Sequence, residues 1–311
     1  MRVLFDMGHP AHVHLFKNTI KKLIKDGHDV KITARDKEVT QSLLTAYGLE
    51  YEDRGKIFTG IFNKAFGMIQ IDLKLFTIAK KFKPDILIGV SNPYVAHVGA
   101  VLRKPVIIFS DTENVTIGRL ITYPFVQTIL TPMYFNENID PKKHIKIQGF
   151  KEIAYLHPNY YSPDPLVLQE LGLLPNEKFI IVRFVSWGAS HDIGHHGIKD
   201  KIGLVRALEN YGRVLLTSEG DLPSELKPNL IKILPEKLHD LLSYAALYFG
   251  EGGTMASEAA VLGTPSIFVS SLAGRFGSLI ELEETYDLLQ SFYESDFISD
   301  SVMSDIMTRT P

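Results

Sequence analysis

The sequence predicts an α/β protein of two domains, each built on a parallel β-sheet. Its length of 311 residues fits two domains of about 150 residues each. In both halves, short β-rich runs alternate with helical patterns, as in βαβ units. Between the halves, residues 155–165 contain three prolines and no hydrophobic period, as a linker does. We therefore expect two Rossmann-like domains, residues 1–160 and 161–311.

The first half opens with a buried strand at residues 2–7. Apolar residues then recur at helical spacing from Val13 to Ile24, and Gly27 ends this helix. The segment before Lys83 and Pro84 is also predicted to be helical, and so are residues 39–47 and 95–102. The further strands expected in this half are residues 29–34, 49–54, 85–90, 105–110, 127–131 and 144–148.

The second half repeats this architecture without a detectable sequence repeat, so we infer no duplication. Its expected strands are residues 178–185, 213–217, 230–234, 247–249 and 265–269. Its expected helices are residues 198–211, 238–246 and 254–262. Residues 297–311 are polar and weakly periodic, and fit either a frayed tail or the remains of a longer helix.

The composition excludes several classes of protein. With 45% hydrophobic and 22% charged residues, the chain is too apolar to be disordered. It has no cysteine, which excludes disulfides, thiolate nucleophiles and cysteine metal sites. The first ten residues lack the apolar core of a signal peptide, and no apolar run reaches the roughly 18 residues of a transmembrane helix. We expect a cytoplasmic protein.

Charge is divided unevenly between the halves. Residues 1–160 hold 22 Lys and Arg against 15 Asp and Glu, a net charge of +7, while the remainder has a net charge of −10. Either the two halves dock through opposite charge, or the basic half faces an anionic partner such as phospholipid at the inner face of the membrane. Nucleic acid is not an expected partner, because no dense Lys/Arg cluster carries interleaved aromatic residues.

Residues 249–265, FGEGGTMASEAAVLGTP, form the most specific segment. A strand ends, glycines make a tight bend, and a helix begins near Thr254. Such a helix start presents free N–H groups and a positive dipole end, and glycine lets a phosphate approach the backbone. Glu258 lies one turn into the helix, where it could accept hydrogen bonds from a ribose. An ordinary strand-to-helix turn with a solvated glutamate is the alternative.

This segment resembles the donor-binding signature of sugar-nucleotide enzymes with the GT-B fold. It is similar to the matching stretch of the peptidoglycan N-acetylglucosaminyltransferase and of the non-hydrolysing UDP-N-acetylglucosamine 2-epimerases, including the SE-A-x-x-G-x-P continuation. Over nearly its full length, the chain also resembles a largely archaeal family described as a domain of unknown function and grouped with GT-B proteins. The resemblance implies a ribose contact from Glu258 and diphosphate contacts from Gly252, Gly253, Thr254 and Met255.

Residues 6–14, DMGHPAHVH, follow the first strand at the edge where parallel sheets bind ligands. The histidines could act as bases, as donors to phosphate or as metal ligands, although no partner stands at the spacing of a zinc site. In GT-B transferases the matching loop lines the cleft near the acceptor, which implies a catalytic base at His9 or His12. The alternative is a histidine that caps the helix or is solvated, and this holds equally for His14.

Asp111 and Glu113 follow the strand at residues 105–110 and are candidate bases. In the 2-epimerases a glutamate follows the corresponding strand, and Glu113 is the nearest match. However, the epimerase Gly-Asp-Thr pattern after the preceding strand is missing, since residues 91–93 are Ser-Asn-Pro. This departure argues against an epimerase. Asp111 could instead cap a turn.

The loop after residues 178–185 lies where GT-B enzymes contact the donor. The resemblance implies donor contacts from Arg183, Ser186 and Trp187, although Arg183 could equally be a buried salt-bridge partner. The His-rich stretch at residues 191–196 reads as a solvated loop, because its spacing fits no standard metal site. Three further donor contacts are expected on later loops: Ser218, Glu219 and His239. Of these, His239 is expected near the uracil ring of the nucleotide.

Residues 58–68, FTGIFNKAFGM, are apolar and aromatic. Core packing and an exposed patch for membrane or a lipid-linked acceptor explain this segment equally well.

The leading hypothesis is a GT-B glycosyltransferase that uses a nucleotide-sugar, most simply a UDP-sugar, and acts in making a cell-surface polysaccharide. The acceptor would be a sugar or a lipid-linked molecule bound by the first domain, and the donor would bind the second domain. We expect no cofactor and no required metal, because the helix start can stabilise the leaving diphosphate and no Asp-x-Asp motif is present. A 2-epimerase-like enzyme and a non-catalytic nucleotide-sugar-binding protein are the alternatives.

Overall fold

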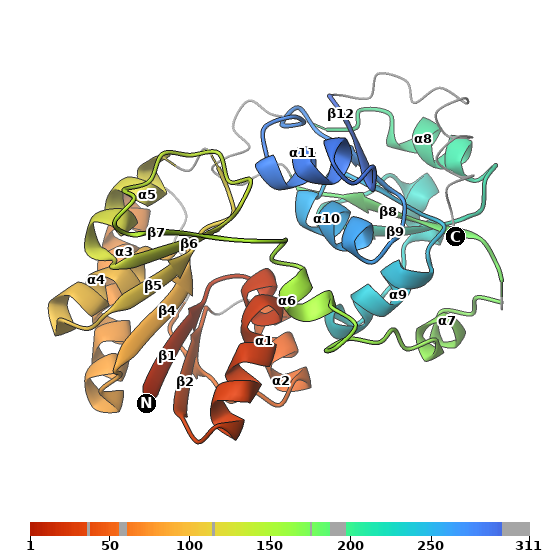
Figure 1. The fold of residues 1–311 in the computed structure, drawn as a ribbon. Helices are drawn as coiled ribbons and strands as arrows, with labels where there is room; N and C mark the ends of the chain where they lie inside the picture. The colour runs from red at the N-terminus through yellow and green to blue at the C-terminus, as the bar shows by residue number, and fades with distance from the viewer. Residues whose placement is uncertain (36–37, 56–60, 114–115, 175, 187–196, 294–311) are drawn as a thin grey trace. The chain divides into compact units, whose positions relative to one another are not determined.

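The structure is a computed structural model, and it describes residues 1–35, 38–55, 61–113, 116–174, 176–186 and 197–293. It divides into two compact units, Met1–Tyr155 and Leu156–Pro311, which we call unit 1 and unit 2 (Figure 1). The division falls at the start of the stretch expected to link the halves. Residues 297–311, for which we considered a tail or a helix, lie outside the described residues.

Unit 1 contains a parallel seven-stranded sheet with the order β3-β2-β1-β4-β5-β6-β7. Leu4 and Phe5, neighbours in β1, point into different hydrophobic clusters on opposite faces of the sheet. Burial on both faces explains why apolar residues are consecutive at the centre of β1, from Val3 to Phe5. The strands are β1 (Arg2–Met7), β2 (Asp29–Ala34), β3 (Glu52–Asp53), β4 (Ile86–Val90), β5 (Val106–Phe109), β6 (Thr128–Pro132) and β7 (His144–Ile147).

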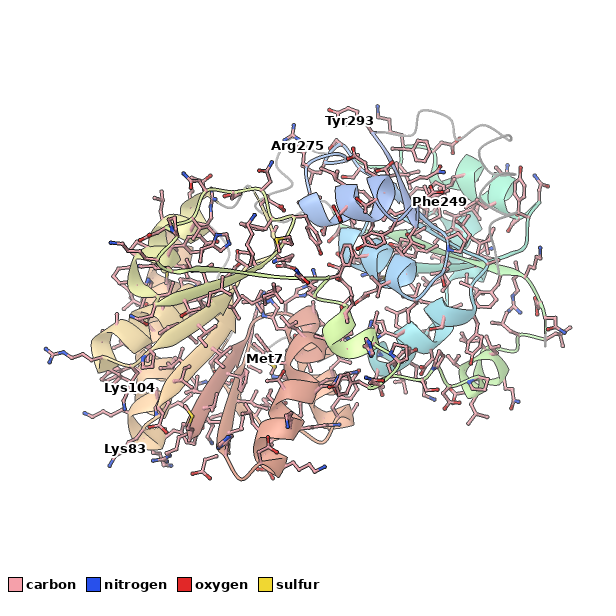
Figure 2. All side chains as sticks on the ribbon, in the orientation of Figure 1. Met7, Lys83, Lys104, Phe249, Arg275 and Tyr293 are labelled. Atoms are coloured by element: carbon pink, nitrogen blue, oxygen red, sulfur yellow. The ribbon has the colours of Figure 1, made fainter. Side chains whose placement is uncertain are left out.

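Helices cover both faces of this sheet (Figure 1). One cluster contains residues of α1 and α2, and the other contains residues of α3 and α4. Figure 2 shows Met7 at the carboxyl end of β1, with Lys83 and Lys104 at the opposite edge. The helices are α1 (Pro10–Lys25), α2 (Glu38–Ala46), α3 (Ile61–Phe82), α4 (Pro93–Leu102), α5 (Thr116–Thr122), the 3-10 turn η1 (Tyr123–Phe125) and α6 (Ile153–Leu156).

Unit 2 contains a parallel five-stranded sheet with the order β12-β11-β10-β8-β9. Phe249, labelled in Figure 2, belongs to its main core cluster with residues of β8, β9 and α8. The strands are β8 (Phe179–Phe184), β9 (Arg213–Ser218), β10 (Leu247–Gly250), β11 (Ser266–Val269) and β12 (Leu289–Phe292). The helices are α7 (Leu166–Glu170), α8 (Lys201–Leu208), η2 (Ser224–Asn229), η3 (Pro235–Lys237), α9 (Leu238–Tyr244), α10 (Gly253–Val261) and α11 (Gly277–Glu284).

The structure corrects several expected elements. The strand expected at residues 49–54 shrinks to β3, and residues 230–234 form no strand beyond a single bridge between Leu230 and Leu216, because prolines at 228 and 235 bound them. The helix expected from residue 198 starts only after Asp200, whose side chain caps it at Gly203 N. The sequence analysis also missed α11 and β12.

Candidate functional site

Each sheet has one point where successive connections run to opposite sides. In unit 1 this point lies between β1 and β4, and in unit 2 it lies between β8 and β10. Open parallel sheets bind ligands at the carboxyl ends of the strands at such a switch point. The loops after these four strands hold most of the residues singled out in the sequence, so each unit has a candidate site of its own.

In unit 2, β10 turns into α10 through a bend that only glycine allows. A Cβ on Gly250 would lie 2.6 Å from Tyr248 Oη and 2.9 Å from the Arg183 carbonyl oxygen. The buried Tyr248 hydroxyl donates to the Gly252 carbonyl at 3.2 Å, which fixes the bend. Gly252 is the N-cap of α10 and provides no side-chain cap. The first-turn N–H groups are therefore available to an anion, and Gly252, Gly253 and Thr254 are partly exposed.

Glu258 and His239 form a buried pair behind this helix start. His239 Nε2 lies 3.1 Å from Glu258 Oε1, and their side chains are only 3% and 5% exposed. The Tyr161 ring meets the His239 ring edge-on, and its hydroxyl donates to Asp240. The structure thus brings together two residues predicted to contact the nucleotide. Glu258 is not the solvated glutamate of the ordinary-turn alternative. Met255 is buried as well, so its backbone alone can serve a ligand.

The sequence analysis missed Glu251, a buried carboxylate between β10 and α10. It accepts the Val185 N–H at 2.9 Å and the Ile198 N–H at 2.7 Å. One side chain thus fixes the described residues on both sides of the segment that follows β8. A glutamate directly between a buried strand and a Gly-Gly pair was the available signal, because such a position is seldom left to a charged side chain without partners.

Arg183 and Glu219 pair at the ends of β8 and β9. Arg183 Nη2 donates to Glu219 Oε1 at 2.6 Å, and the Ser186 hydroxyl donates to Glu219 Oε2 at 3.4 Å. Arg183 therefore forms a salt bridge, but not the buried one that was the alternative, because its partner Glu219 is 46% exposed. Ser218 closes its own turn by donating to the Gly220 carbonyl. Trp187 and the His-rich stretch at residues 191–196 lie outside the described residues.

In unit 1, the three histidines after β1 have different surroundings. His9 is exposed and caps α1, with Nδ1 accepting the Ala11 N–H at 3.2 Å. His12 is partly exposed, and its Nδ1 accepts the Gly8 N–H at 3.2 Å. This contact leaves the proton on Nε2, so the neutral ring is a donor there. His14 is buried in the unit's core, stacked on Tyr155 and bonded to Tyr47.

Asp111 pairs with Lys151 after β5, and both side chains are largely buried. Lys151 was not recognised in the sequence, because it lies 40 residues away. Glu113 is 6% exposed, and its Oε1 accepts the Asn136 N–H at 3.5 Å. Glu113 therefore contacts the loop after β6 instead of projecting from the edge.

Burial and neighbouring charges together set the protonation of His12 and Asp111. Burial lowers the pKa of His12 to about 3, helped by the charges of His9, Lys151 and Arg54 and opposed by Asp111. Burial alone would raise the pKa of Asp111, but Lys151 and His12 bring it below its ordinary value. At neutral pH, His12 is neutral and Asp111 is a carboxylate.

Beneath these loops lies a buried network around Asp6. Its Oδ1 accepts the Thr33 hydroxyl at 2.6 Å and lies 2.7 Å from Arg54 Nε, while Oδ2 accepts Asn92 Nδ2. Asn92 also caps α4 by accepting the Tyr94 N–H at 2.9 Å. The network joins the carboxyl ends of β1, β2, β3 and β4. Asn92 is the middle residue of Ser-Asn-Pro at 91–93, where the epimerases have Gly-Asp-Thr, and these two contacts give it a structural role there.

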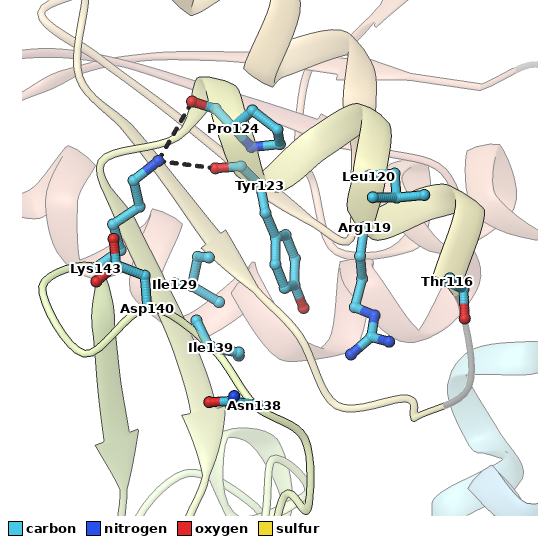
Figure 3. A pocket seen from close by; sticks show the side chains of 10 residues that line it. All are labelled: Thr116, Arg119, Leu120, Tyr123, Pro124, Ile129, Asn138, Ile139, Asp140 and Lys143. Atoms are coloured by element: carbon cyan, nitrogen blue, oxygen red, sulfur yellow. Dashed lines mark hydrogen bonds between the residues drawn. The ribbon is translucent and has the colours of Figure 1, made fainter.

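A cavity of about 360 Å³ lies in unit 1 between α5, η1 and the loop before β7 (Figure 3). Its lining includes Arg119, Tyr123, Asp140 and Lys143, and Lys143 donates to the carbonyls of Tyr123 and Pro124. None of the residues predicted from the sequence lines it.

Within the described part of the chain, no three His, Asp or Glu side chains gather in a way that could hold a metal ion. No helix there has the length and apolar character needed to cross a membrane.

Solved structures similar to this chain include a UDP-GlcNAc 2-epimerase and a glycosyltransferase. The UDP-GlcNAc 2-epimerase of Methanocaldococcus jannaschii, solved in complex with UDP-GlcNAc and UDP, has a TM-score of 0.66 at 14% identity, over 100% of this chain and 92% of the other. The spinosyn forosaminyltransferase SpnP has a TM-score of 0.63 at 16% identity, over 99% and 90%. At these identities the likeness shows the fold, which is GT-B, with two Rossmann-like units.

Sequence comparison gives the family. An uncharacterised protein of Methanocaldococcus jannaschii, MJ0665, is 26% identical over 277 residues, covering 85% of this chain and 80% of that protein. The profile of DUF354, a family of proteins of unknown function, matches residues 1–280. The chain therefore belongs to the DUF354 family.

Proposed function

We propose that this protein is a glycosyltransferase that moves a sugar from a UDP-sugar to a hydroxyl of a sugar or lipid-linked acceptor, in the synthesis of a cell-surface polysaccharide. The observation that carries the proposal is the start of α10 at the switch point of unit 2, where N–H groups without a side-chain cap are partly exposed. A nucleotide diphosphate suits such a helix start. The similar epimerase solved with UDP-GlcNAc and UDP supports this choice of donor.

The donor roles follow from unit 2. Gly252, Gly253, Thr254 and the backbone of Met255 would bind the diphosphate and stabilise its charge as it leaves, without an obligatory metal ion. For Glu258 to bind the ribose, its buried pair with His239 must separate. His239 would then contact the nucleobase of the donor. Four residues at the ends of β8 and β9 complete the proposed donor contacts: Arg183, Ser186, Ser218 and Glu219.

Unit 1 would supply the catalytic groups. In the proposed displacement, a base takes the acceptor hydroxyl proton, the oxygen bonds to the anomeric carbon, and the bond to the diphosphate breaks. We assign the base to Asp111, a carboxylate at neutral pH, or to the exposed His9 once its Nδ1 releases the Ala11 N–H. Because its Nδ1 accepts the Gly8 N–H, His12 holds its proton on Nε2, and we propose that it donates a hydrogen bond from there. Glu113 has no part in this scheme.

A peripheral membrane contact on the cytoplasmic side is part of the proposal. On α3, Phe66, Ile69 and Leu73 are 61%, 57% and 61% exposed, at the spacing of one helix face. Such a stripe on the basic unit suits an anionic bilayer. In residues 58–68, expected to be either core or patch, Phe66 is exposed and Gly67 is buried. Residues 58–60 lie outside the described part of the chain.

The test is a thermal-shift panel of UDP, GDP, CMP and dTDP sugars, with and without EDTA. We compare the wild type with Thr254→Asp, which puts a negative charge at the α10 start. An aspartate there favours the helix but repels a diphosphate, so folding is kept while binding is lost. Thr116→Asp, at the exposed start of α5, is the matched control. No shift with any nucleotide, or equal shifts in both variants, would contradict the donor site.

An activity assay separates the transferase from its alternatives. Incubating the protein with UDP-N-acetylglucosamine and no acceptor yields UDP-N-acetylmannosamine only if the protein is an epimerase. A non-catalytic protein would bind the nucleotide without any turnover when acceptors are added.

A further inference from the structure

Two arginines lie side by side at the carboxyl edge of unit 1, outside the proposed catalytic groups. Arg35 follows β2 and its N–H donates to the Met7 carbonyl, while Arg54 follows β3 and its N–H donates to the Ala34 carbonyl, both at 2.9 Å. The backbone thus fixes Arg35 beside the end of β1 and Arg54 beside the end of β2. The Arg54 side chain is 2% exposed, and Arg35 is partly exposed.

Part of each guanidinium group lacks a hydrogen-bond acceptor. Arg35 Nε and Arg54 Nη1 are buried, and neither has a hydrogen-bond partner among the residues that the structure describes. Asp6 Oδ1 lies 2.7 Å from Arg54 Nε, and this ion pair leaves Nη1 of the same group without an acceptor. Buried donors in folded proteins are almost always satisfied, by protein, water or an ion. Two unsatisfied donors on neighbouring guanidinium groups therefore need an explanation.

The two guanidinium groups also repel each other. The carboxylates of Asp6 and Asp72 both interact with Arg54. Burial, and then the charge of Arg54, lower the pKa of Arg35, which shows that the two cations interact unfavourably. The Tyr94 ring, 4.7 Å from Arg54 Cζ, offers a π face but no anionic charge. An anion would relieve this repulsion and supply the missing acceptors.

The surroundings place these donors at the switch point of the sheet. A Cβ on Gly8 would lie 3.3 Å from Arg54 Nη2 and 3.9 Å from His12 Cε1. The guanidinium group thus lies under the backbone of Gly8, next to the ring whose Nε2 carries a proton. Both arginines and His12 donate at the edge where a ligand of unit 1 is expected.

We propose that Arg35 and Arg54 bind an oxyanion, a phosphoryl or carboxylate group carried by the substrate of unit 1. Guanidinium groups suit both, because their forked donors match two oxygens of such a group. The inference rests on the proposed function in identifying this substrate as the acceptor, and it deepens that function by making the acceptor acidic. A dianionic phosphoryl group gains more from the paired cations than a carboxylate does.

The test titrates inorganic phosphate and acetate into the full chain and follows the backbone amide NMR signals of Gly8 and His12. We expect saturable shifts in the wild type, with phosphate binding more tightly. Arg35→Gln should weaken binding at least tenfold, and Arg103→Gln, at the exposed far end of α4, should leave it unchanged. Arg54→Lys, which keeps the charge but loses the fork, should also weaken it.

Shifts that fail to saturate with both anions, or equal affinity in the wild type and Arg35→Gln, would overturn the inference. Because Arg35 is partly exposed, its glutamine variant should fold even if Arg54→Lys does not. The readout lies in unit 1 and involves no nucleotide. Anion binding can therefore be detected even if the protein does not bind UDP, and it can be absent even if the protein does bind UDP.

Discussion

Replacing Glu251 with glutamine tests the local architecture of unit 2. The carboxylate is 4% exposed and accepts two backbone N–H groups that lie 66 and 53 residues before it in the chain. Glutamine has the same size but only one acceptor oxygen. One N–H would keep its partner, and the other would face an amide NH₂ group. The change thus removes one hydrogen bond, and it leaves a backbone N–H and the glutamine NH₂, both donors, facing each other in the protein interior.

The magnitude follows from these contacts. A hydrogen bond to a charged group contributes about 1.5–3 kcal/mol, and an unsatisfied buried donor costs about 1–3 kcal/mol more. Allowing for relaxation, we expect Glu251→Gln to lower the free energy of unfolding by about 2–4 kcal/mol. With a urea dependence of about 1–3 kcal/mol per molar, the midpoint should fall by about 1–2 M.

The assay is urea denaturation followed by the fluorescence of Trp187, the chain's single tryptophan, which lies in unit 2. Glu284→Gln on exposed α11 makes the same charge change and should leave the midpoint within error. Equal midpoints for the two variants would refute the bridging role of Glu251.

Three further predictions concern packing and charge. Gly250→Ala should cost about 1–3 kcal/mol in thermal melts, because the new methyl meets Tyr248 Oη at 2.6 Å. The pKa of His12 is about 3 when folded against 6.5 in a model peptide, so the unfolded chain binds the proton more readily and stability should fall as pH drops from about 6.5 to 3. His12→Gln should flatten that dependence. Lys151→Met should raise the pKa of Asp111, measured by carboxyl NMR, because only His12 and the Thr112 hydroxyl then oppose the effect of burial.

Much of the architecture was predictable because it depends on local pattern. Apolar runs and glycine stops define the strands and helices around both switch points. Gly27 and Gly263, with φ of 82° and 88°, follow α1 and α10 in the left-handed region that glycine tolerates, so the ends of both helices could be predicted. The fold class and the start of α10 followed from these signals.

The contacts that define the candidate sites could not be predicted in this way, because they join residues far apart in the chain. The pair of Asp111 with Lys151 and the two contacts of Glu251 have no sequence period. The network of Asp6 with Arg54 joins loops that only the strand order brings together. Burial of Glu258 depends on its packing against α9, which its helical position alone does not reveal.

The central claim is that a nucleotide diphosphate binds the start of α10. The direct measurement is a titration of UDP followed by the backbone amide NMR signals of Gly253 and Thr254. The account predicts large saturable shifts of these signals, with Thr254→Asp abolishing the saturation. UDP binding that leaves both signals unmoved, or no binding of UDP at all, would contradict it.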